Sequence, residues 1–196
     1  SSSSPNGGDA NADNTSTNDS AANTTGEQGP RRNESADNAE AIEETERSLQ
    51  RLTEPSVGHA DGLHDLLLAL GPLSLDEIAK RCPGDPAPLV GTLEGEGRAF
   101  RVAMAGALRL AAVEDLGRLR DALGVAVPPG VPAALLEPVA DALGDLCSRF
   151  ARTHGPFTHE LARRRFGVDV RPAFARLIAQ GRVVEGELLP GGRGSE

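Results

Sequence analysis

The sequence predicts a mainly α-helical fold with small β-hairpins (α+β), in which tandem winged helix-turn-helix modules follow a disordered tail. Three observations lead to this prediction. The first 56 residues offer few side chains that a core could bury, two later stretches each have the order helix, helix, helix and hairpin, and those stretches match at a fixed spacing. We place the tail at residues 1–56, the first module with its following helix and proline-rich connector at 57–132, and a second, truncated module at 133–196.

The tail is defined by its composition and charge. Residues 1–40 are mostly Ser, Asn, Asp, Thr, Gly and Ala, and such a segment buries too little apolar surface to offset the entropy lost on ordering it. Residues 1–56 hold 11 of the 29 acidic side chains and 4 arginines, so most of the chain's net charge of −9 lies there. Residues 39–52 are compatible with a helix. Because the chain opens on Ser1, we expect it to be a piece of a longer protein.

The first module begins with a helix whose leucines recur at the spacing of one buried face. These leucines are Leu63, Leu66, Leu67 and Leu70. Ser74, with Glu77 three residues later, predicts a capping box at the start of a second helix over about 75–82. The residues that this helix should bury are Leu75, Ile78, Ala79 and Cys82. A third helix over 86–95 and alternating apolar residues from Phe100 onward then predict a hairpin.

The second module repeats this order 84 residues later. Gly71-Pro72-Leu73-Ser74 falls on Gly155-Pro156-Phe157-Thr158, and Leu93 falls on Leu177. Its second and third helices are predicted at 159–166 and 170–180. A hairpin should begin at Arg182 and turn at Pro190-Gly191-Gly192. Between the modules, residues 113–123 predict a helix and residues 127–132 an extended connector.

A basic surface is predicted on the second module alone. Residues 146–196 hold 9 arginines and 5 acidic residues, whereas the third helix of the first module presents Glu94 and Glu96, which repel phosphates. In a winged helix, the third helix lies in the major groove and the second helix contacts phosphates. The candidate nucleic-acid-binding residues are therefore Arg163, Arg164, Arg165, Arg171, Arg176 and Arg182. The alternative is a solvated face, or pairing with Glu185 and Glu187.

Other chemistry has no support in the sequence. Cys82 and Cys147 lack the spacing of a zinc site, and His154 and His159 lack partners for a base or a metal ligand. We assign no catalytic residue, no metal or cofactor site and no small-molecule substrate to this chain, and we do not expect it to be an enzyme on its own. No apolar run is long enough to span a membrane, and no signal segment opens the chain, so we expect a cytoplasmic protein.

Several stretches of the chain resemble the C-terminal region of the actinobacterial large helicase-related proteins, Lhr, over about residues 58–196. The most specific are Arg152-Thr153-His154-Gly155-Pro156-Phe157-Thr158 and Gly181-Arg182-Val183-Val184-Glu185-Gly186-Glu187. Others are Ala112-Val113-Glu114-Asp115, Glu137-Pro138-Val139-Ala140-Asp141 and Pro190-Gly191-Gly192. The resemblance implies an ATP-dependent DNA helicase of superfamily 2 involved in DNA repair. Its motor domains, which use ATP and Mg²⁺, are N-terminal, and tandem winged helices and a β-barrel follow them.

The chain also departs from that family. It contains no GxxxxGK phosphate loop and no DEAD-like box, so the motor is absent. A uracil glycosylase activity is attributed to the family's C-terminal region. No residue for it can be carried over, because the matching segment, a Trp-Cys-Asp stretch and a basic helix, lies past the position of Glu196.

Three functions remain open at this point. The first is an accessory nucleic-acid-binding segment of a repair helicase, with single- or double-stranded DNA as its partner. The second is a protein–protein scaffold that contacts the remainder of the helicase or its oligomer. The third is a stand-alone winged-helix transcription regulator, for which we find neither a dimerisation helix nor an effector pocket. Salt-dependent binding to DNA discriminates the first two.

Overall fold

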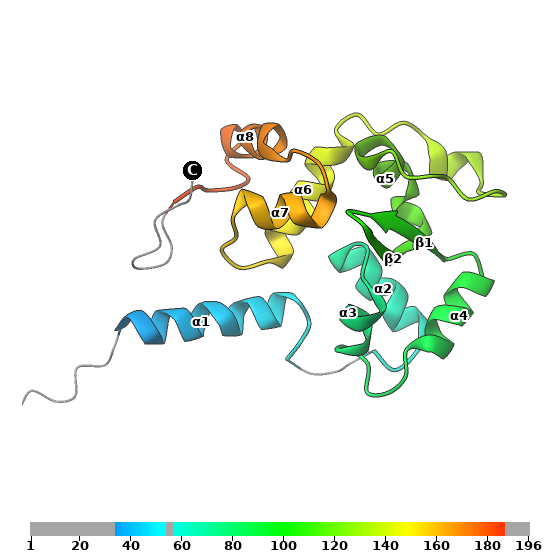
Figure 1. Cartoon of the computed structure of the whole chain (residues 1–196), viewed down its shortest axis with the longest axis horizontal. Helices are drawn as coiled ribbons and strands as arrows, with labels where there is room; N and C mark the ends of the chain where they lie inside the picture. Colours follow the sequence, from blue (N-terminus) through cyan, green and yellow to red (C-terminus); the bar gives the residue numbers. More distant parts are fainter. Residues whose placement is uncertain (1–33, 54–56, 187–196) are drawn as a thin grey trace, which may run out of the picture. The chain divides into compact units, whose positions relative to one another are not determined.

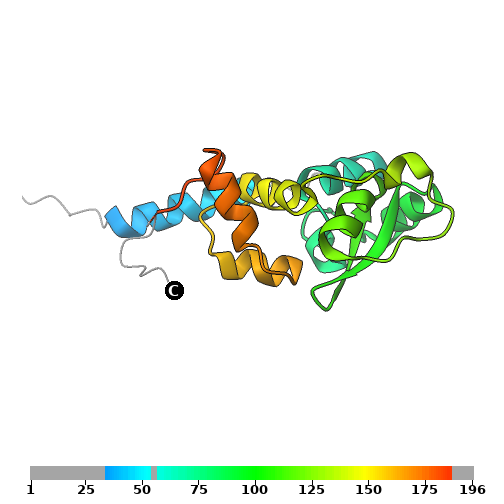
Figure 2. The same ribbon diagram turned by 90° about the horizontal axis from the view of Figure 1, so that it is seen from above.

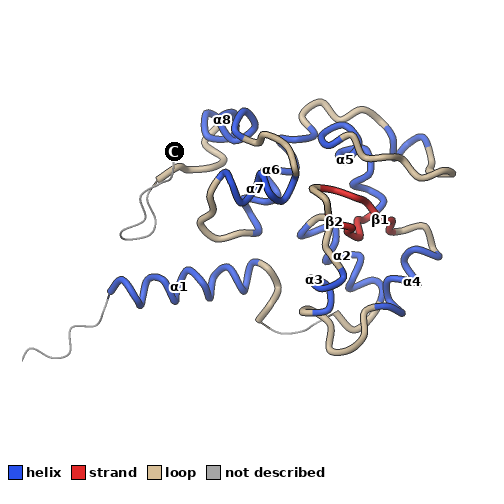
Figure 3. Tube along the Cα trace, in the orientation of Figure 1, coloured by secondary structure: helices blue, strands red, loops and turns tan. Residues whose placement is uncertain are grey.

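The structure, a computed structural model, describes residues 34–53 and 57–186. In chain order its elements are α1 (Glu34–Leu49), α2 (Ala60–Leu70), α3 (Leu75–Ala79), α4 (Ala87–Gly95), β1 (Ala99–Met104), β2 (Ala107–Ala112), the 3₁₀ turn η1 (Val113–Asp115), α5 (Leu116–Leu123), the 3₁₀ turn η2 (Ala133–Leu136), α6 (Ala142–Thr153), α7 (His159–Phe166) and α8 (Arg171–Ala179) (Figure 1). The strands of the described residues form one antiparallel pair (Figure 3). The predicted mainly helical winged-helix fold is confirmed.

The first module has the predicted order of elements, and the four leucines of the α2 stripe are all buried. Ser74 and Glu77 form the predicted capping box of α3. The predicted inward face of that helix is partly wrong, because α3 ends at Ala79 and both Leu75 and Ala79 are exposed. A helix of little more than one turn directs only a narrow face inward, and in α3 that face is Ile78.

The wing of the first module is the β1–β2 hairpin. Its register runs from Ala99 opposite Ala112 to Met104 opposite Ala107. The two turn residues, Ala105 and Gly106, both have positive φ angles (51° and 75°), as expected for the tightest turn that matches the twist of a hairpin. Leu73 and Leu110 add a short antiparallel bridge, with N–O distances of 2.9 and 2.7 Å.

Helix α1 lies in the segment that we assigned to the disordered tail. The structure instead has a 16-residue helix from Glu34 to Leu49, and the side chain of Gln50 just beyond it hydrogen-bonds the Thr153 carbonyl at the end of α6. The prediction of disorder is therefore wrong for residues 34–53. The polar composition of this segment predicted disorder, but the helix is held by contacts with residues far away in the sequence, which no local pattern indicates. Residues 1–33 lie outside the described residues, so for them the tail remains a prediction.

Several backbone features of the first module recur in the second at the 84-residue spacing. Arg98 N donates to Leu93 O, and Arg182 N donates to Leu177 O, both at 2.9 Å. Gly97 and Gly181 end the third helices with the same φ of 69°. The repeated leucines are both buried, at 0% and 1% exposure. Thr158 caps α7 through the amide of Leu161, as predicted.

The hairpin predicted for the second module does not begin at Arg182. Residues 182–186 contain no strand, and residues 187–189 with the predicted turn at 190–192 lie outside the described residues. A strand requires a partner for its hydrogen bonds, and the returning strand would lie beyond residue 186. The described part of the second module is therefore a three-helix unit.

The two modules share a hydrophobic core. Side chains of α6, α7 and α8 form that core together with Val102, Met104 and Ala111 of the first module's wing and Leu119 of α5. Helix α6 contacts α2, α5 and α8 (Figure 2). A Cβ atom on Gly167, the residue that ends α7, would lie 3.1 Å from the Cα of Ala105 in the wing turn. The described residues from 34 to 186 thus belong to one compact unit, and residues on both sides of the predicted boundary at 132/133 contribute to the same core.

Candidate nucleic-acid interface

Two of the predicted arginines lie exposed on α7. Arg163 is 57% exposed and donates to Glu160 at 2.7 and 2.9 Å, one turn earlier in the same helix. Arg164 is 69% exposed, and its nearest carboxylate is also that of Glu160, at 3.7 Å. The hydrogen bond from Arg163 holds the pKa of Glu160 below its ordinary value. Both guanidinium groups face solvent, so a phosphate can reach them.

Arg165 does not belong to this exposed surface. Its side chain is only 15% exposed, and its guanidinium donates to Glu77 at 2.5 Å and to the Pro72 carbonyl at 2.7 Å. Both acceptors lie in the first module. Burial lowers the pKa of Arg165, and the charge of Glu77 opposes this effect. The sequence could not distinguish Arg165 from Arg163 and Arg164, because it does not show which side of α7 faces α3.

Glu77 is the centre of a polar cluster between the modules. Its carboxylate accepts from Arg165, from Arg109 of β2 at 2.7 Å, and from the backbone amide of Ser74 at 2.7 Å. Burial alone would raise the pKa of Glu77. The charge of Arg165, the amide hydrogen bond and the charge of Arg109 together hold this pKa below its usual range. Glu77 was predicted as a helix cap, but its two ionic partners were not.

The remaining three candidates lie on or beside α8. Arg171, 75% exposed, donates to the neighbouring Asp169 at 2.9 Å. Arg176, 51% exposed, pairs at 2.8 Å with Asp141, the residue that caps α6. Arg182 donates to the buried hydroxyl of Ser148 at 2.7 Å.

The predicted alternative, in which the arginines pair with Glu185 and Glu187, is not seen in the described part of the chain for the three side chains on or beside α8. Within the described residues, neither Arg171, Arg176 nor Arg182 pairs with Glu185, and Glu187 lies outside those residues. All four of Arg163, Arg164, Arg171 and Arg176 are exposed cationic groups of the predicted surface. Arg182 is also exposed, but its guanidinium donates to the buried Ser148.

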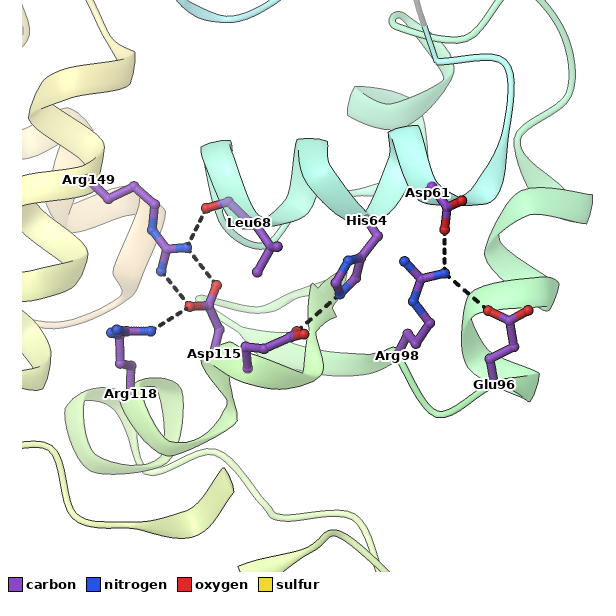
Figure 4. Close-up of polar contacts among 9 residues, drawn as sticks. Asp61, His64, Leu68, Glu96, Arg98, Asp115, Arg118 and Arg149 are labelled. Atoms are coloured by element: carbon purple, nitrogen blue, oxygen red, sulfur yellow. Dashed lines mark hydrogen bonds and ion pairs between the residues drawn. The ribbon is translucent and has the colours of Figure 1, made fainter. Parts of the chain in front are cut away.

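The matching surface of the first module is occupied by internal ion pairs. Glu94 of α4 accepts from Arg101 of β1 at 2.8 Å. Arg98 donates to Asp61 at 2.7 Å and to Glu96 at 3.3 Å (Figure 4). These carboxylates give the third helix of this module an acidic exterior, as the sequence indicated.

A second intermodule contact was missed by the sequence reasoning. Asp115 is 1% exposed, and its carboxylate accepts from both terminal nitrogens of Arg149, at 2.7 and 2.9 Å (Figure 4). Arg149 lies on α6 and also donates to the Leu68 carbonyl of α2 at 3.1 Å. Arg118 adds a contact to Asp115 at 3.3 Å. Asp115 directly precedes α5, a position where an acidic side chain also favours the start of a helix. No local pattern distinguishes that role from a buried pair whose partner lies 34 residues away.

The histidines and cysteines have structural surroundings. His154 ends α6, stacks on Phe150 with ring centroids 3.7 Å apart, and has a pKa lowered chiefly by burial. His159 is exposed. Burial raises the pKa of the Cys147 thiol to about 12. Among the described residues, no group of three or more His, Cys, Asp or Glu side chains could hold a metal ion.

The family described as "Large helicase-related protein, winged-helix domain" matches residues 38–138, just over half of the chain. The chain belongs to the large helicase-related family. The Lhr match begins inside α1 and ends after η2, so the Lhr winged-helix domain includes most of the helix that lies in the predicted tail.

Two relatives are similar to the chain over more residues than the family model matches. An Lhr helicase/probable uracil glycosylase of Mycolicibacterium smegmatis is 46% identical over 151 residues, or 74% of this chain. An Lhr helicase/uracil glycosylase of Escherichia coli is 35% identical over 135 residues, or 67% of this chain. The chain spans about a tenth of the length of these Lhr proteins, 10% and 9% respectively. It is thus similar to a winged-helix part of Lhr-type helicases.

The helices were also assessed as possible membrane spans. None of the helices in the described residues is long and apolar enough to cross a bilayer.

Proposed function

We propose that this chain is an accessory nucleic-acid-binding segment of an ATP-dependent DNA helicase that acts in DNA repair in the cytoplasm. In this proposal the motor, with its ATP and Mg²⁺, belongs to other parts of the helicase, and the segment performs no catalysis of its own. The observation that carries the proposal is the set of exposed arginines on α7 and α8. The uracil glycosylase named for the two relatives remains an activity of those proteins.

The position of these arginines supports phosphate contact. Helices α7 and α8 are the second and third helices of a winged helix, the elements that touch phosphates and lie in the groove, respectively. Among the residues that the structure describes, Arg163 and Arg171 pair only with nearby exposed carboxylates, Glu160 and Asp169. Such surface pairs contribute little to stability, so a phosphate can replace the carboxylate at small cost. Arg164 and Arg176 lie on the same two helices and extend this surface.

Fluorescence anisotropy with a labelled oligonucleotide tests the proposal. We expect the Arg163→Ala/Arg171→Ala variant to bind single- and double-stranded DNA at least about tenfold more weakly than the unmodified chain, because each charge-assisted hydrogen bond is worth about 1.5–3 kcal/mol. The matched control is Arg98→Ala/Arg101→Ala, which removes two paired arginines from the first module. Equal losses in the two variants would contradict the assignment to the second module.

A protein–protein scaffold is the second candidate. It is favoured by two exposed apolar side chains of the first module, Leu75 and Leu108, which are 47% and 57% exposed. They line a recess of about 230 Å³ together with Val90 and Leu110. If the unmodified chain binds no DNA at low salt, this candidate replaces the first, and the partner is the remainder of the helicase or its oligomer.

A further inference from the structure

A cleft of about 580 Å³ lies among α1, α3, β2, α6 and α7. Its volume is in the range of pockets that hold a small ligand. Six cationic side chains line it, against the carboxylates of Glu43, Glu46 and Glu77. The six are Arg47, Lys80, Arg81, Arg109, Arg164 and Arg165. The cleft thus carries an excess of positive charge, although the whole chain is acidic.

The inner part of the cleft holds three guanidinium groups and one carboxylate. Arg109 and Arg165 share Glu77. Arg81, which is 3% exposed, donates instead to neutral oxygens, namely the backbone carbonyls of Gln50 and Glu77 and the side-chain oxygen of Gln50. Neutral acceptors satisfy the hydrogen-bonding groups of Arg81, so within the described residues no carboxylate pairs with it directly. The charge of nearby Glu77 opposes the lowering of the Arg81 pKa by burial, but Glu77 is already shared by Arg109 and Arg165. Because these groups are held away from water, their potential is weakly screened at the cleft opening.

The outer part of the cleft offers cations that are free to bind. Lys80 is exposed, and no ion pair forms on it in the described part of the chain. Arg164 has only its 3.7 Å contact with Glu160. Across the opening, Glu43 and Glu46 of α1 form no ion pair with either cation among the described residues. The opening therefore presents two exposed cationic groups in front of the less exposed arginines of the interior.

We propose that this cleft binds a phosphate group, which Lys80 and Arg164 would contact and which the interior arginines would attract. A phosphate suits this lining because its oxygens accept several charge-assisted hydrogen bonds at once. The inference rests on the proposed nucleic-acid function where the phosphate belongs to a strand, and is independent of it where the phosphate belongs to a free nucleotide. The carboxylates of Glu43 and Glu46 would disfavour an anion that lies against α1, and so direct the phosphate toward α3 and α7.

Titration of the whole ¹⁵N-labelled chain with sodium pyrophosphate at constant ionic strength tests this site. We expect saturable shifts of the backbone amides of Lys80, Arg81 and Arg164. Lys80→Gln and Arg164→Gln should each weaken binding about tenfold. The matched control is Arg152→Gln, an exposed arginine of α6 that does not line the cleft, and it should bind as the unmodified chain does. Thermal melting followed by circular dichroism confirms that each variant is folded.

The outcomes separate this inference from the proposed function. Unsaturable shifts, or equal affinity in the Lys80→Gln variant and the unmodified chain, would overturn the cleft site even if oligonucleotides bind elsewhere. Pyrophosphate binding without any oligonucleotide binding would support the cleft and refute the proposed function. Where both bind, comparing a 5′-phosphorylated with an unphosphorylated oligonucleotide distinguishes a terminal phosphate from an internal one as the occupant.

Discussion

Replacing Asp115 with asparagine removes the negative charge that Arg149 contacts across the two modules. The change keeps the size of the side chain but replaces one carboxylate oxygen with an amide NH₂ group, which cannot accept a hydrogen bond from a guanidinium. Two hydrogen bonds of 2.7 and 2.9 Å depend on that carboxylate. The Asp115 side chain is 2% exposed and that of Arg149 is 12% exposed, so water cannot replace the lost acceptor.

The expected cost follows from this burial. Removing one member of a buried ion pair leaves the other charge uncompensated and destabilises a protein by about 3–5 kcal/mol. Domains of this size are stable by about 5–15 kcal/mol, so Asp115→Asn should remove a large share of the stability of the chain. Arg149→Met should cost a similar amount. The double variant should cost less than the sum of the two, with a coupling free energy of about 2–4 kcal/mol.

Urea unfolding followed by far-ultraviolet circular dichroism measures this cycle, since the chain has no Trp or Tyr to report by fluorescence. The control cycle uses Asp61 and Arg98, whose exposed pair should show little coupling. Additive losses from Asp115→Asn and Arg149→Met would refute the claim that this pair couples the modules. Separate unfolding transitions for the two modules in the unmodified chain would do so as well.

Three further predictions concern pH, the repeat and thiol chemistry. His154 has a folded pKa below 6.5 and Glu77 one below 4.5, so each contributes stability above its unfolded pKa that is lost as the pH falls through its folded pKa. The melting temperature should fall on acidification below about pH 6.5, and His154→Gln should abolish the upper part of that fall; an unchanged profile would contradict this. Leu93→Ala and Leu177→Ala should each cost about 2–5 kcal/mol in urea unfolding, and a small cost at either would show that the two leucines are not equivalent. Cys147, with a pKa of about 12, should resist a thiol reagent at pH 8 until the chain unfolds, and rapid labelling of the folded chain would disprove its burial.

Local patterns predicted the helices well. The α2 stripe, the capping box of Ser74 and Glu77, and the cap at Thr158 all depend on residues a few positions apart, and the structure has each of them. The repeat added information that no single module contains. It placed Leu177 at the core position of Leu93, and the same backbone hydrogen bond follows both residues.

Contacts between the modules could not be predicted in this way. Arg165 has the same sequence surroundings as Arg163 and Arg164, and only its direction toward Glu77 makes it structural. Asp115 pairs with Arg149, which lies on α6 beyond the proline-rich connector. Such pairs depend on how two separately predicted units pack. The sequence therefore predicted the basic face of the second module but assigned to it one arginine that serves the interface.

The salt dependence of DNA binding by the unmodified chain tests the central claim most directly. Each phosphate contact releases condensed counterion, and the slope of log affinity against log salt concentration is about −0.9 per contact on duplex DNA. Contacts by three or four of Arg163, Arg164, Arg171 and Arg176 predict a slope of about −3 to −4, which Arg163→Ala/Arg171→Ala should flatten by about 2. Absence of binding at low salt, or a slope that this variant leaves unchanged, would contradict the account and favour the scaffold.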